Sequence, residues 1–164
     1  MSLARRILIF GGIALALWGM AYGLWYAALA EHQALDTIGA SLSSGFANAA
    51  ERHPERAHAS LGEYREAKYV YDRQVDVHGH WIGLAMLLIV LGIGLDRVFL
   101  SERSKLLLSF GALLGAILFP LGVLLQTIDH GTAPRFIAIV GSALIIITLA
   151  AFALGFSRSR LPAR

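Results

Sequence analysis

Four long apolar stretches limit what this chain can fold into. They occupy residues 7–30, 77–95, 106–128 and 135–157, and the only charge within them is Arg135, at the edge of the last. Each has about 20 residues or more, enough for an α-helix to cross the ~30 Å hydrocarbon core of a bilayer. With 57% hydrophobic residues among 164, the chain is too apolar for an ordinary soluble domain. The sequence predicts an all-α, integral membrane four-helix bundle, with residues 1–164 as a single membrane domain.

Most of the charged residues lie between the first two stretches, in residues 31–76. Apolar residues recur there at helical spacing, at Leu35, Ile38, Leu42 and Phe46. This periodicity predicts an amphipathic helix. After Pro54 the segment is rich in residues that favour helices, so a second helix is expected to run without a break into the 77–95 span. Residues 31–76 are therefore predicted to form a long helical loop outside the membrane.

The distribution of lysine and arginine predicts the orientation. Four spans put both termini and the short 96–105 connection on the same side, and this side has a dense group of basic residues near the span ends. The basic residues of the long loop are diluted and outnumbered by acidic ones. The positive-inside rule then places the termini in the cytoplasm. We expect a bacterial inner-membrane protein whose long loop faces the periplasm.

All six histidines fall on the outer half of this topology. Four of them lie within about one helical turn of an outer span boundary: His32, His78, His80 and His130. A buried imidazole without a partner costs roughly 1–3 kcal/mol, so polar groups at this depth point to a functional site. His53 and His58 lie in a charged run and are expected to be solvated.

His78 and His80 begin the second span two residues apart. On a helix this spacing separates them by about 200°, so they face different sides. His80 shares a face with Asp76, which is suited to orienting an imidazole by a hydrogen bond. His78 shares a face with the apolar Ile82, Ala85 and Ile89, a surface that suits a flat porphyrin. One of the two is the expected ligand, and the other is an orienting group, an interface residue or a lipid-headgroup contact.

Composition and motifs narrow the possible chemistry. The chain has no cysteine, which excludes disulfides, thiolate metal sites and covalent c-type haem attachment. It also lacks an HExxH motif, a glycine-rich phosphate loop, a serine nucleophile elbow and a basic patch interleaved with aromatic residues. Hydrolysis by a familiar triad and nucleic-acid binding are therefore not expected. Haem b remains, as does a copper or zinc site if His32, His130 and one or both of His78 and His80 converge.

One short motif resembles a known family. Val77–His78 is followed eight residues later by Met86, with the small Ala85 before it. This pattern and the four-span layout resemble styrene oxide isomerase-like small membrane haem b proteins. The resemblance implies that His78 is an axial haem ligand. The chain has Leu84 in place of the family's asparagine, and its third span lacks the tyrosine and acidic residues of the isomerase pocket.

The leading hypothesis is a small inner-membrane haem b-binding protein acting in redox or isomerase-like chemistry, with its site near the periplasmic face. His78 is the preferred iron ligand, His80 the next choice, and His130 or His32 a second ligand or distal group. Two alternatives remain. One is a metal-free accessory or interaction subunit, or a homo-oligomer held by glycine-rich helix faces. The other is a periplasm-facing copper- or zinc-binding protein.

Overall fold

The structure is a computed structural model that describes residues 1–158, and its described residues form helices and short connections without strands. The chain divides into two compact units. The first, called the bundle below, comprises Met1–Met20 and the described residues from Val77 onward. The second, the hairpin unit, comprises Ala21–Asp76. The sequence predicts one membrane domain; the structure groups residues 31–76 with the last ten residues of the first predicted span in a unit of their own.

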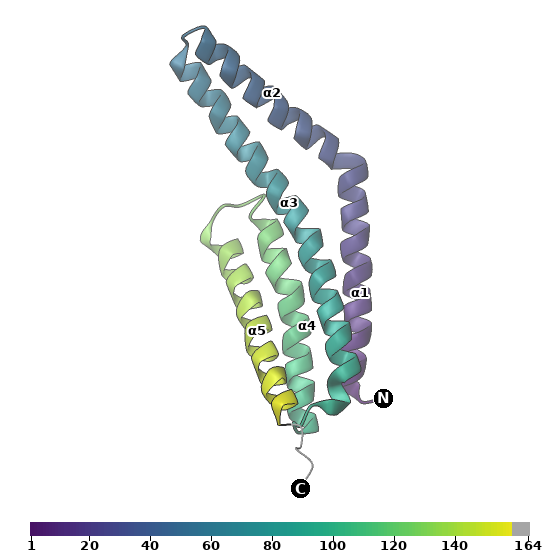
Figure 1. Ribbon diagram of the computed structural model, residues 1–164. Coiled ribbons are helices and arrows are strands. Elements are labelled where there is room, and N and C mark those ends of the chain that lie inside the picture. Colours follow the sequence, from purple (N-terminus) through teal and green to yellow (C-terminus); the bar gives the residue numbers. More distant parts are fainter. Residues whose placement is uncertain (159–164) are drawn as a thin grey trace. The chain divides into compact units, whose positions relative to one another are not determined.

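Four helices of the described chain are long and apolar enough to cross a membrane (Figure 1). They are α1 (Leu3–Trp25), which continues through the π-helix η1 (Tyr26–Ala30), α3 (Pro54–Gly94), α4 (Glu102–Leu125) and α5 (Thr132–Ser157). Helix α3 is continuous from Pro54 into the second predicted span, as expected. Helix α4 ends three residues before 128. Helix α5 begins three residues before 135, with Gly131 as its N-cap residue.

Glycines bring the helices of the bundle close together. A methyl group added at Gly12 of α1 would lie 2.9 Å from the Ala85 carbonyl oxygen of α3. At Gly122 of α4 it would lie 2.7 Å from the Cα atom of Ala138 in α5. Small residues permit such backbone approach, on which helix packing in lipid depends. The predicted glycine-rich faces are thus engaged within the chain at these positions; a homo-oligomer held by such faces stays a prediction.

The hairpin unit contains α2 (Glu31–Ala50) and the first part of α3. The amphipathic helix predicted from 31 onward is present, but its buried face differs from the apolar stripe. Ser41 and Gly45 are buried, whereas Leu35 and Phe46 are 46% and 69% exposed. Small residues pack better against the neighbouring helix here, since Gly45 faces Leu61 and Ser60 at ordinary contact distance.

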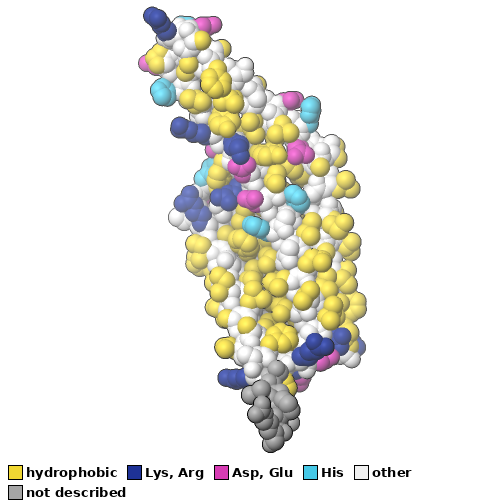
Figure 2. Space-filling view, viewed as in Figure 1, with side chains coloured by type: hydrophobic (Ala, Val, Ile, Leu, Met, Phe, Trp, Pro, Cys, Tyr) yellow, Lys and Arg dark blue, Asp and Glu magenta, His cyan; other side chains and the backbone are white. Residues whose placement is uncertain are grey.

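Charged and apolar surfaces separate on the bundle. Hydrophobic side chains cover much of its face in Figure 2, and charged groups gather at the end that carries the N-terminus. At that end the guanidinium of Arg5 lies 2.8 Å from the carboxylate of Asp96. In the first turn of α4, the ammonium of Lys105 lies 3.0 Å from the carboxylate of Glu102. This pattern suits a bundle surrounded by hydrocarbon with one charged end in water.

Candidate functional site

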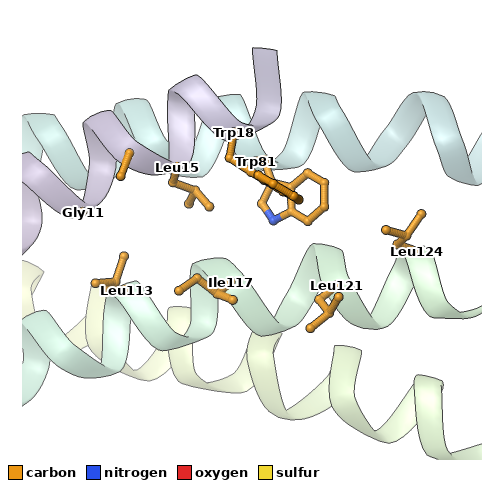
Figure 3. A pocket seen from close by; sticks show the side chains of 9 residues that line it. Gly11, Leu15, Trp18, Trp81, Leu113, Ile117, Leu121 and Leu124 are labelled. Carbon is orange, nitrogen blue, oxygen red and sulfur yellow. The ribbon is translucent and has the colours of Figure 1, made fainter. Parts of the chain in front are cut away.

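An apolar cavity of about 460 Å³, open on one side, lies between α1, α3 and α4 of the bundle. Helix α1 contributes small and apolar residues to its wall: Gly11, Ala14, Leu15 and Trp18. Helix α4 contributes one apolar side chain per turn: Leu113, Ile117, Leu121 and Leu124. In Figure 3 the Trp81 side chain, from α3, extends into the space between the two walls. All these side chains are apolar, so the cavity suits a hydrophobic molecule.

Trp18 and Trp81 form the aromatic part of the cavity wall. Their rings meet edge to face, with centroids 6.0 Å apart and an interplanar angle of 78°. Trp81 is only 3% exposed, whereas Trp18 is 58% exposed. Gly19 allows this arrangement because it has no side chain. A methyl group added there would lie 3.0 Å from the Trp81 Cβ atom. The pair places two rigid aromatic rings beside the apolar volume.

His78 lies one helical turn before Trp81 on α3 and is half-buried. Its Nδ1 atom is buried and finds no hydrogen-bond partner among the described residues. Leaving an imidazole nitrogen unsatisfied in an apolar bundle costs roughly 1–3 kcal/mol, so this atom calls for a partner such as a metal, a cofactor or a water. It is the strongest structural sign of a ligand at the predicted histidines.

The apolar surface expected beside His78 is occupied by α1. An added methyl group at Gly12 would meet Ile89 and Ala85, and one at Gly19 would meet Ile82 at 3.1 Å. Because α1 packs so closely on Ile82, Ala85 and Ile89, this face has no slot for a porphyrin. The free apolar volume lies instead on the Trp81 side of α3.

His80 has a different environment from His78. Its half-buried ring stacks on Phe119 of α4, with centroids 4.9 Å apart and planes 25° from parallel. His80 thus faces α4. His78 lies one helical turn before Ile82, which contacts α1, so His78 is on the α1 side of the helix. Asp76, expected to orient His80, lies 4.0 Å from the Arg73 guanidinium.

The remaining predicted histidines are exposed. His130 lies in the turn between α4 and α5, where the Gly131 amide donates to the Asp129 carboxylate at 2.7 Å. The side chain of His32 is 89% exposed and belongs to the hairpin unit, 3.5 Å from Asp36. His53 and His58 are exposed as expected. Residues 1–158 contain no group of three or more histidines, cysteines or acids that could hold a metal ion.

These arrangements bear differently on the predicted cofactors. Copper or zinc in a protein takes three or four such ligands, and the described residues do not assemble them. Haem b needs fewer groups: one imidazole and an apolar volume. His78 offers a buried nitrogen without a partner, but it is not among the residues that line the cavity at Trp81, and α1 covers the apolar face beside it. The residues present therefore supply one candidate axial ligand, and the described chain shows neither a second histidine nor a slot for a porphyrin beside His78.

The sequence pattern does not predict the cavity. Gly11, Ala14 and Trp18 recur every three or four residues, the spacing of one helix face, but the same spacing is equally typical of a packed interface. Whether such a face meets a neighbour or a void depends on how far the next helix stands away. That separation is set by contacts elsewhere in the bundle.

Comparisons with protein families, with curated proteins and with solved structures found nothing that matches this chain.

Proposed function

We propose that this chain is a small inner-membrane protein that binds haem b, with His78 as the protein ligand of the iron. The observation that supports this most is the buried Nδ1 atom of His78, which has no hydrogen-bond partner among the described residues. Bound haem supplies an iron centre for redox or isomerase-like chemistry. His78 would hold it, and the neighbouring apolar residues around Trp81 would keep water out.

A visible spectrum of the purified protein tests the proposal. We expect a Soret band, iron by elemental analysis and haem b in a pyridine haemochrome assay. In His78→Ala the band disappears, because the iron loses its protein ligand. His130→Ala is the matched control: it removes an exposed histidine and leaves the band unchanged.

His80→Ala separates the two neighbouring histidines. Its ring stacks on Phe119, so its loss is expected to lower stability while the Soret band stays. A band that survives in His78→Ala and vanishes in His80→Ala would overturn the ligand assignment. Thermal melting of each variant, followed by circular dichroism, shows whether loss of colour reflects loss of the fold.

A second candidate is a metal-free accessory or interaction subunit of a membrane complex. The close packing of α1 on the His78 face favours it, because that face has no room for a porphyrin. A colourless protein without iron, purified from cells supplied with a haem precursor, would decide for this candidate. The two functions predict opposite spectra, so the same preparation distinguishes them.

The proposed orientation has cytoplasmic termini and a periplasmic hairpin unit. Basic residues at the end of the bundle that holds Arg5, Arg97 and Lys105 support it. Labelling of single cysteines with a membrane-impermeant maleimide in intact cells tests it. Cysteine at Gly62 should react and cysteine at Ser104 should not.

A further inference from the structure

The apolar cavity of the bundle has a shape that selects among possible occupants. Its α1 wall runs from Gly11 to Trp18 and its α4 wall from Leu113 to Leu124. At ~1.5 Å per residue these walls are about 10 and 16 Å long. The cavity is therefore an elongated slot along the helices rather than a round chamber.

The slot closes at one end. A methyl group added at Gly11 would lie 2.9 Å from both terminal carbons of Leu113, so α1 and α4 touch there. Farther along, Leu15 and Ile117 face each other across the open space (Figure 3). A transmembrane helix needs a groove about 10 Å wide along its whole length, which this closed end does not leave. A single hydrocarbon chain fits a slot that narrows.

The chemistry of the lining excludes polar occupants. The slot is lined by glycine, alanine, leucine, isoleucine and tryptophan side chains, and its residues all fall within the apolar stretches of the sequence. A polar group placed there without a partner would lose its hydration, and a large apolar cavity does not hold water well. Its volume of about 460 Å³ is roughly three times the ~150 Å³ of an engineered cavity that binds benzene.

The exposed residues along the slot define how an occupant enters. Two lining residues are exposed, Trp18 by 58% and Ile117 by 40%, and the adjacent Leu114 is 49% exposed. This side of the bundle is therefore open. In a membrane that side borders hydrocarbon. We infer that the slot between α1, α3 and α4 binds one acyl chain of a bilayer lipid, which enters from the side and lies against Trp81. His78 is not among the residues that line the slot, so the inference does not rest on haem binding.

Trp81 provides a direct reporter, because it is 3% exposed and yet lines the slot. The chain has three tryptophans, so Trp18→Phe with Trp25→Phe leaves Trp81 as the only one. The experiment reconstitutes this protein in phosphatidylcholine vesicles with a rising fraction of lipid brominated at mid-chain. Bromine quenches tryptophan only on contact. Trp81 fluorescence is divided by its value in vesicles of the same lipid without bromine. This ratio cancels any constant quenching by a bound cofactor.

We expect Trp81 fluorescence to fall by about twofold or more, because a chain in the slot contacts the indole. The quenching should saturate before the brominated lipid dominates the membrane. Ala14→Phe, which places a ring in the slot, should abolish the saturating part. Ala143→Phe on α5, an exposed alanine outside the lining, should leave it unchanged.

Two results would overturn the inference. One is weak quenching that rises linearly with brominated lipid and is identical in Ala14→Phe, which means that no chain occupies the slot. The other is an unquenched Trp81 together with a dimer in native mass spectrometry that Ala14→Phe disrupts, which means that a second copy covers it. Neither result affects the Soret band, so the test of haem binding stays separate.

Discussion

The two units of this chain pack their helices by different means. In the bundle, an added methyl group at Gly12, Gly115 or Gly122 would overlap backbone atoms of the neighbouring helix. In the hairpin unit, the nearest atom to such a group at Gly45 is 3.5 Å away, and no described atom lies within 4 Å of one at Gly39 or Gly62. The bundle thus has close backbone contacts at these glycines, and Gly39, Gly45 and Gly62 of the hairpin unit have none.

Polar contacts show the reverse distribution. Within the hairpin unit the Tyr22 hydroxyl donates to the Gln74 side-chain oxygen, and Tyr71 donates to Glu31 at 3.4 Å. The buried hydroxyls of the bundle, those of Ser109 and Thr148, donate to carbonyls of their own helices. Lipid tails are as apolar as leucine, so helices within a bilayer gain little from apolar burial and rely on close fit. The hairpin unit uses hydrogen bonds between helices as well.

The largest expected effect comes from Gly122. In Gly122→Ala the new methyl group overlaps the backbone of Ala138, and the helices α4 and α5 must separate. We expect the free energy of unfolding to fall by about 1–3 kcal/mol, the usual cost of overpacking. Titration with sodium dodecyl sulfate in mixed micelles, followed by circular dichroism, measures it.

Gly83→Ala is the matched control in the same unit. No described atom lies within 4 Å of its added methyl group, and alanine favours a helix over glycine by roughly 0.5–1 kcal/mol. This variant should be as stable as the parent or more so. Equal destabilisation by both substitutions would show that backbone contact does not hold the bundle together.

The sequence predicts the helices well and the spaces between them poorly. Uncharged length alone locates four spans, and the helix from Pro54 through Gly94 follows from the absence of proline after Pro54. The boundaries shift where local caps decide, as at Gly131. The porphyrin surface beside His78 stays a prediction, because periodicity identifies an apolar face without saying that Gly12 and Gly19 let α1 cover it. The buried His78 nitrogen and the Trp81 slot depend on those same distances.

The tyrosines of the hairpin unit offer a second test of the contrast. Tyr22→Phe removes the donor to Gln74 and should lower the free energy of unfolding by about 0.5–1.5 kcal/mol. Tyr26 is 5% exposed, and its hydroxyl has no hydrogen-bond partner in residues 1–158. Tyr26→Phe should therefore be neutral or slightly stabilising, since it removes a buried group that makes no hydrogen bond. Hydrogen exchange of the 21–76 amides reports both variants, and a larger loss in Tyr26→Phe would reveal a partner for that hydroxyl.

The smallest expected effect concerns the Arg5–Asp96 ion pair at the charged end of the bundle. The two side chains are 31% and 70% exposed, so water and salt screen their attraction. A double-mutant cycle with Arg5→Gln and Asp96→Asn should give a coupling energy of up to about 1 kcal/mol that shrinks as salt is added. Because close backbone contact holds the bundle, breaking this pair should leave Gly122→Ala as costly as before. A coupling energy well above this range and insensitive to salt would mean that the Arg5–Asp96 pair contributes more to the stability of the bundle than its exposure indicates.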